Sequence, residues 1–116
     1  MKDTRRIPSQ VACLSKERKL ISTILRLSEI FGDQAFDVVD HWESNFCAVG
    51  IAQKMNHSIL VYIDNFEQDN DTYHVELERP PFPGTNLPFS SAGSFEKVSF
   101  EDLCTLISRH LELQSG

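Results

Sequence analysis

Histidine and carboxylate side chains are the groups of this chain that could support catalysis, and they gather first around His41. Asp37, Asp40 and Glu43 lie close to His41 in the sequence, a combination suited to general acid–base chemistry. Strand alternation would place Asp37, His41 and Glu43 on one face and Asp40 on the other. Charged side chains also protect an edge strand from aggregation, and we interpret these four residues as solvated edge charges.

The remaining histidines and the cysteines have structural explanations. His74 lies on the outward face of an expected strand, His57 lies in a turn, and His110 lies near a helix end, where a positive charge suits the helix dipole. The cysteines are far apart, and no Cys-x-x-Cys pair, phosphate-binding glycine loop or His-Glu-x-x-His motif occurs. We therefore predict a non-enzymatic protein with no catalytic residue, metal or cofactor. The alternative is an enzyme or small-molecule binder with His41 or His74 in a cleft.

An acidic segment covers residues 64–71. It lacks the central glycine and the closing glutamate of a calcium-binding loop, so we interpret it as a solvated hairpin tip or as a docking surface for a basic protein. In the docking interpretation, acidic residues attract the partner and aromatic residues anchor it. The predicted partner-binding residues are the acidic Asp64, Glu67, Asp69 and Asp71 and the aromatic Tyr62, Phe66, Phe82 and Phe89.

The distribution of charge separates the start of the chain from its body. Residues 1–26 carry seven basic and two acidic side chains, while the rest of the chain carries four basic and fifteen acidic ones. An acidic body repels nucleic acid and attracts basic partners. Because no apolar run approaches the roughly 20 residues that span a bilayer, and the N-terminus lacks the apolar stretch of a secretory signal, we expect a cytoplasmic protein that binds neither nucleic acid nor membrane.

Hydrophobic periodicity predicts a helix near each end of the chain. After a basic arm at residues 1–8, apolar side chains recur at helical spacing up to Phe31, and Gly32 provides a left-handed stop. Ser99 is the expected N-cap of the last helix, with Asp102 three residues later as in a capping box. The last helix carries its own apolar stripe, and residues 114–116 form a frayed tail.

The segment between these helices alternates with the period of a β-strand. Strands are expected within 36–43, 46–53, 59–63 and 72–78, followed by a proline-rich loop to about residue 94 and a short strand near Phe95. Short connections favour an antiparallel meander of about four strands, with both helices packed on one face. The predicted fold is α+β, in the order α-β-β-β-β-α, as a single domain over residues 9–113.

The sheet face opposite the helices is also expected to carry apolar side chains. They are Phe46, Ala48, Ala52, Leu60 and Tyr62. Because contiguous apolar surface is rarely left in water, the loop residues Phe82, Leu87 and Phe89, a partner protein or a second copy of the chain should cover this face. A secretion-chaperone-like homodimer, formed through this apolar face, is therefore the alternative within the binding class.

Residues 46–111 resemble small bacterial immunity-type proteins, which accompany polymorphic or contact-dependent toxins. The matching elements are Val49-Gly50-Ile51-Ala52, the strand from Ile59 to Ile63, Tyr73-His74-Val75-Glu76-Leu77-Glu78, Pro80-Pro81-Phe82-Pro83-Gly84 and the closing helix from Phe100. The resemblance implies a small, acidic, cytoplasmic inhibitor that binds a toxin domain and blocks its site. It assigns no functional residue, and the basic first helix departs from the pattern.

Overall fold

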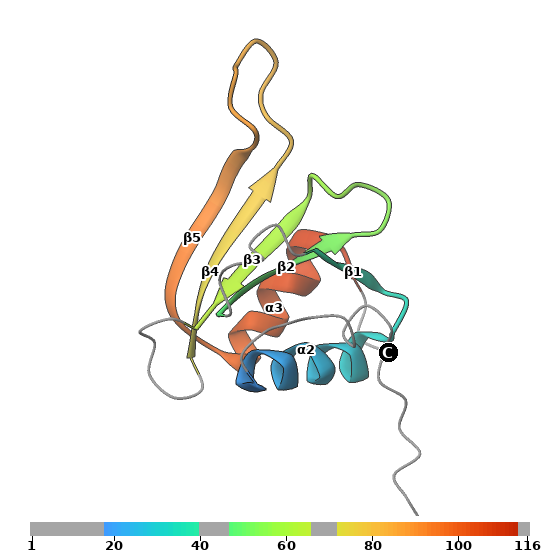
Figure 1. The fold of residues 1–116 in the computed structure, drawn as a ribbon. Helices are drawn as coiled ribbons and strands as arrows, with labels where there is room; N and C mark the ends of the chain where they lie inside the picture. The colour runs from blue at the N-terminus through green and yellow to red at the C-terminus, as the bar shows by residue number, and fades with distance from the viewer. Residues whose placement is uncertain (1–17, 40–46, 66–71, 114–116) are drawn as a thin grey trace, which may run out of the picture.

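The computed structural model describes residues 18–39, 47–65 and 72–113, which form two helices and one five-stranded sheet (Figure 1). In chain order the elements are α2 (Arg18–Phe31), β1 (Phe36–Val39), β2 (Ala48–Gln53), β3 (Leu60–Asp64), β4 (Thr72–Arg79), β5 (Ser90–Ser99) and α3 (Phe100–Leu111). The strands are antiparallel and lie in the order β1-β2-β3-β4-β5. The predicted α+β meander between two helices is confirmed.

Both helices pack on the same face of the sheet. One apolar core joins Leu20, Ile24 and Leu27 of α2 with Leu103 and Ile107 of α3, and all five of these side chains are fully buried. Every strand adds side chains from its inner face to this core. Each buried leucine or isoleucine contributes about 1.5–3 kcal/mol of burial free energy, so this face holds the fold together.

Local signals set the ends of the helices, as the sequence predicts. Gly32 has a φ of +104°, and its N–H donates to the Ser28 carbonyl at 2.8 Å, which ends α2. The Ser99 side chain accepts a hydrogen bond from the Asp102 N–H at 3.1 Å, which caps α3.

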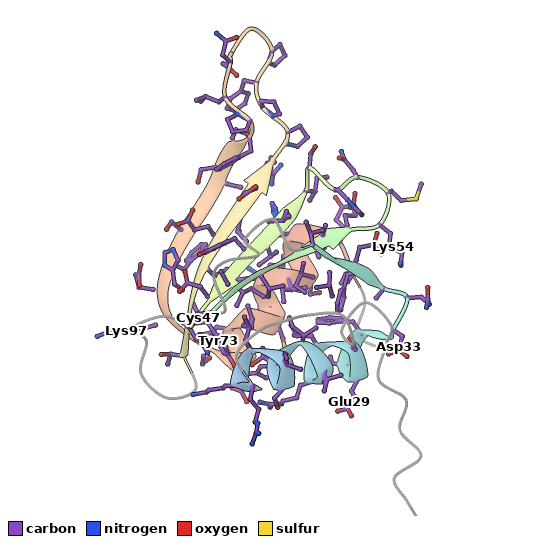
Figure 2. All side chains as sticks on the ribbon, viewed as in Figure 1. Glu29, Asp33, Cys47, Lys54, Tyr73 and Lys97 are labelled. Atoms are coloured by element: carbon purple, nitrogen blue, oxygen red, sulfur yellow. The ribbon has the colours of Figure 1, made fainter. Side chains whose placement is uncertain are left out.

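A buried hydrogen bond connects α2 to the sheet. Tyr73 is 2% exposed, and its hydroxyl lies 2.5 Å from Thr23 Oγ1 (Figure 2). Thr23 Oγ1 donates its own proton to the Lys19 carbonyl at 3.0 Å, so the Tyr73 hydroxyl must be the donor in the bond between the two side chains.

Replacing Tyr73 with phenylalanine removes this donor, and we expect the free energy of unfolding to fall by about 1 kcal/mol. Urea unfolding should show a lower midpoint with an unchanged slope. Tyr62→Phe is the matched control, since it removes a half-buried hydroxyl from the opposite face and should cost less. Equal midpoints for wild type and Tyr73→Phe would contradict the assigned bond.

The loop expected up to residue 94 is shorter than predicted, because β5 begins at Ser90 and pairs along the length of β4. Phe95 and Val98 are three residues apart, yet they pair with Val75 and Tyr73, whose side chains face the core. A β-bulge between these pairs supplies the extra residue, with Lys97 at a φ of +55°. A second irregularity opposite Leu77 and Glu78 includes Gly93 at a φ of +152°. The bulges break the period of two, which hides this strand in the sequence.

The two bulge positions should respond oppositely to substitution. In Gly93→Ala the new Cβ would lie 2.8 Å from Phe95 Cε1, at a φ that side chains rarely adopt. Even if the Phe95 ring moves aside, the backbone conformation should cost more than about 1 kcal/mol. Lys97→Gly should raise stability by up to about 1 kcal/mol, because glycine tolerates positive φ. Thermal unfolding of both variants measures this, and a lower midpoint for Lys97→Gly would contradict the bulge assignment.

Candidate functional site

The candidate site is a groove on the sheet face that the helices leave uncovered. Its walls come from alternate residues of β3 and β4, from the β2–β3 turn and from the base of the β4–β5 arm (residues 80–89). The groove has a volume of about 640 Å³. Its lining residues are His57, Ser58, Leu60, Tyr62, Asp64, His74, Glu76, Glu78, Pro88 and Phe89.

Strand register brings the polar lining together. Asp64 pairs with His74, Tyr62 pairs with Glu76, and Leu60 pairs with Glu78 across β3 and β4. Opposed residues on one face of an antiparallel pair lie close enough to interact. The result is an aromatic and acidic strip with Leu60, which is 2% exposed, at its apolar end.

Tyr62 and Asp64 are joined within this strip. The Tyr62 hydroxyl donates to Asp64 Oδ2 at 2.7 Å. Burial, together with the hydrogen bond to Asp64, raises the pKa of Tyr62, so the phenol stays neutral and remains a donor. Tyr62 thus offers a fixed apolar ring to a ligand while its hydroxyl orients the neighbouring carboxylate.

His74 lies at the centre of the acidic strip, with a side chain only 15% exposed. Its Nε2 lies 2.8 Å from Glu76 Oε2, with which it forms a hydrogen bond. Its Nδ1 lies 2.6 Å from Glu96 Oε2, a close charge contact that lacks hydrogen-bond geometry. The β5 bulge produces this second contact, because the extra residue between the flanking pairs places Glu96 opposite His74.

The surroundings of His74 favour its protonated form. Burial alone would lower the pKa of His74, but the hydrogen bond to Glu76 and the charges of Glu96, Asp64 and Glu76 outweigh burial and raise it. Only the imidazolium carries a proton on both ring nitrogens, and both nitrogens face carboxylates here. These surroundings therefore favour a positive charge on His74 among the acidic groups of the groove.

Protonation of His74 makes the stability of the fold depend on pH, and the contribution of His74 to stability decreases as pH rises. Folding raises the pKa of His74, so the protonated ring contributes to the free energy of unfolding. This contribution is complete below the pKa of the unfolded chain, about 6.5, and is lost as pH rises through the pKa of the folded chain. We expect the unfolding free energy of wild type minus that of His74→Gln to be largest in acid and to shrink above neutrality. Urea unfolding of both proteins across this pH range measures the difference, and a gap that widens with rising pH would refute the assignment.

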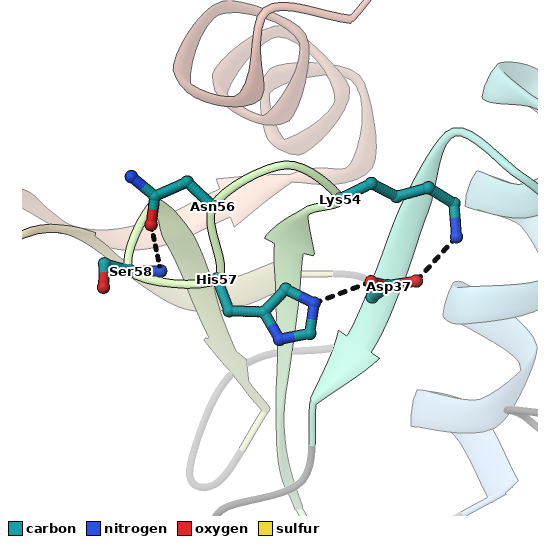
Figure 3. Close-up of polar contacts among 5 residues, drawn as sticks. All are labelled: Asp37, Lys54, Asn56, His57 and Ser58. Carbon is teal, nitrogen blue, oxygen red and sulfur yellow. Dashed lines mark hydrogen bonds and ion pairs between the residues drawn. The ribbon is translucent and has the colours of Figure 1, made fainter.

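An ion pair network fixes the turn at the other end of the groove (Figure 3). Asp37 Oδ1 lies 2.7 Å from Lys54 Nζ, and Asp37 Oδ2 lies 2.6 Å from His57 Nε2. Hydrogen bonds from Lys54 and then His57 hold the pKa of Asp37 below its usual range. Asn56 Oδ1 accepts the Ser58 N–H at 3.0 Å and tightens the turn. Asp37 therefore joins β1 to the β2–β3 turn, which presents His57 and Ser58 to the groove.

Of the acid–base cluster expected around His41, only Asp37 is among the described residues, and Asp40, His41 and Glu43 lie outside them. His110 lies in the last turn of α3, as expected, and it also makes a contact that the sequence did not predict. It is 9% exposed, and its Nε2 donates to the Glu78 carbonyl at 2.7 Å, so it connects α3 to β4. The reason is the position of His110 on the buried face of α3, next to Leu111 and above the sheet.

The predicted partner-binding residues separate into three groups. Tyr62, Asp64 and Phe89 line the groove, while Phe82 lies on the β4–β5 arm and is 68% exposed. Phe66, Glu67, Asp69 and Asp71 lie outside the described residues. The predicted partner-binding residues omitted Glu76, Glu78 and Glu96, and His74 was named only for the alternative of an enzyme or small-molecule cleft. The alternation of β4 places His74, Glu76 and Glu78 on its outward face, so the sequence could have indicated these residues. The position of Glu96 depends on the bulge in β5, which the sequence does not indicate.

The expectation that the loop covers the outer sheet face is wrong for Phe82 and Leu87. These side chains are 68% and 64% exposed, and the β4–β5 arm extends beyond the end of the sheet (Figure 1). Pro80, Pro81 and Pro83 restrict the arm, and Gly84 has a φ of +85° at its tip, so the backbone turns there. Only the base of the arm, at Pro88 and Phe89, reaches the groove.

Across the ranges that the structure describes, no group of three or more histidine, cysteine, aspartate or glutamate side chains is arranged to hold a metal ion. No helix in those same ranges is long and apolar enough to cross a membrane. Comparisons with models of known protein families, with curated proteins and with solved structures find no match to this chain.

Proposed function

We propose that this chain is a non-enzymatic protein-binding domain that takes a basic segment of a partner protein into the groove. The observation that carries the proposal is the alignment of Asp64, Glu76 and Glu78 beside Tyr62 and Phe89 in one open groove. Acidic groups attract a basic partner over distance, and aromatic side chains supply contact area at low entropic cost. An open groove of about 640 Å³ that runs over two neighbouring strands suits a polypeptide segment.

The β4–β5 arm supports the same proposal as a second contact. Phe82 and Leu87 are largely exposed on it, and Met55 is 91% exposed on the β2–β3 turn at the same end of the sheet. Large exposed apolar side chains grouped at one end of a domain are typical of interaction surfaces. The arm is also preordered, since the Phe82 carbonyl accepts from the Thr85 hydroxyl at 2.9 Å, which reduces the entropy lost on binding.

Two narrower forms of the proposal name different partners. The resemblance to immunity-type proteins suggests a toxin domain whose site the bound chain would occlude in a bacterial cytoplasm. A secretion-chaperone-like homodimer would instead use the apolar outer sheet face. However, Ala48 and Ala52 on that face are fully buried within the chain itself, which favours a different protein as the partner.

A small-molecule or catalytic site is the second candidate, because His74 and Glu76 line the groove and Glu96 contacts His74 from the neighbouring strand β5. A cationic small molecule would suit these carboxylates. Catalysis by a histidine base is less favoured, since the same carboxylates raise the pKa of His74 and so favour its protonated form.

Neutralising the groove should slow association with a partner captured from the native host. We expect Glu76→Gln/Glu78→Gln to lower the association rate constant several-fold, and raising salt from 50 to 500 mM to lower it about tenfold or more. The matched control is Glu29→Gln/Asp33→Asn, which removes the same charge from exposed positions near α2 (Figure 2). Surface plasmon resonance measures the rates.

Two results would contradict the proposal. One is an equal association rate for the groove variant and the control variant. The other is an association rate that does not change with salt for a partner whose complex is otherwise specific.

A further inference from the structure

His74 occupies the position that a ligand cation would be expected to take in this groove. Its ring lies between Glu76 of β4 and Glu96 of β5, and Asp64 of β3 is its cross-strand neighbour. The imidazole is largely buried, whereas the Glu96 side chain is 65% exposed and the Glu76 side chain is 43% exposed. A partner therefore meets the carboxylates first, with the imidazolium lying beneath them.

The proton on His74 controls how much negative charge these carboxylates present. An imidazolium carries a proton on both ring nitrogens, so it donates a hydrogen bond to Glu76 and places a second N–H in close charge contact with Glu96, whereas a neutral imidazole carries only one of these protons. Loss of the proton thus removes the positive charge of the ring and makes the net charge around these carboxylates more negative by one. The Tyr62 ring, which packs edge-on at 6.2 Å from the His74 ring, stays neutral and adds no charge.

The other charged groups around His74 lie at the edge of the sheet, at the far end of the groove or further along β4. Lys97 adjoins Glu96, but its side chain extends outward from the β5 edge (Figure 2). His57 lines the far end of the groove and is bound to Asp37. Glu78, two residues beyond Glu76 on the same face of β4, adds further negative charge.

We infer that the groove binds an arginine or lysine side chain of the partner in exchange for the proton of His74, so that binding tightens as His74 is deprotonated. The inference rests on the proposed function and adds the chemistry of the ligand and its regulation by pH. A guanidinium fits best, since its planar donors can bridge two carboxylates, whereas an ammonium acts as a point charge.

Thermodynamic linkage between binding and protonation of His74 sets the direction and the upper limit of the pH dependence of binding. A cation beside Glu76 and Glu96 disfavours a second positive charge on His74, so binding must lower the pKa of His74 by the same free energy by which protonation weakens binding. Release of one proton makes the dissociation constant fall by at most about tenfold for each pH unit. At pH values below the pKa of His74 in the complex, the dissociation constant no longer changes with pH.

The test follows the His74 ring by NMR in the full-length chain. The probe is a capped pentapeptide of alternating arginine and leucine, and its control has glutamine in place of arginine. We expect the saturating arginine peptide to lower the His74 titration midpoint by at least about 0.5 pH unit and the control peptide to leave it unchanged. In Glu96→Gln, whose side chain is exposed enough to spare the fold, the peptide-induced change should shrink.

Binding constants measured across the same pH range complete the test. The dissociation constant of the arginine peptide should fall with rising pH in wild type and in His57→Gln, and should become pH-independent in His74→Gln. If the arginine peptide binds in the groove without moving the His74 midpoint, or if the pH dependence disappears in His57→Gln instead, the inference is wrong and the proposed function stands. If the arginine peptide fails to bind at every pH, both are wrong.

Discussion

The strict alternation of β3 and β4 is the constraint on which the rest of the structure depends. Tyr73, Val75 and Leu77 face the helices, while His74, Glu76 and Glu78 face away from them. A shift of the register by one residue would bury the charged set and expose the apolar set, at a cost of many kilocalories per mole. The same requirement that builds the core therefore places the acidic groups side by side on the opposite face.

That placement creates an electrostatic problem within the fold. Asp64, Glu76 and Glu96 converge on a small area, and like charges on neighbouring strands destabilise a sheet. The imidazolium of His74 offsets this repulsion, since it contacts two of the carboxylates and lies across from the third. The β5 bulge supports the arrangement by directing Glu96 toward the ring, at the expense of a positive φ at Lys97.

Sequence reasoning succeeded where a signal was local and failed where several elements had to meet. Gly32 and Ser99 end and begin their helices through contacts within a few residues, so both were predictable. The alternation of inward and outward side chains in β4 was predictable from the sequence for the same reason. The full length of β5 was not, because its bulges interrupt the period of two and place Phe95 and Val98 on the same face. The contact between Asp37 and His57 could not be inferred either, since it depends on the register of β1 against β2.

The groove itself shows why outward-facing charge is hard to interpret from sequence. On a solvated strand, His74 and Glu76 would be ordinary polar residues, and alternation alone predicts nothing more. Their significance comes from Asp64 on one neighbouring strand and Glu96 on the other, which turn a polar face into a focused negative site. If a partner's cation takes over the charge balance that His74 provides in the free chain, binding would relieve the repulsion that folding created. Stability and recognition would then depend on the same few carboxylates, which links the strength of binding to the protonation of one histidine.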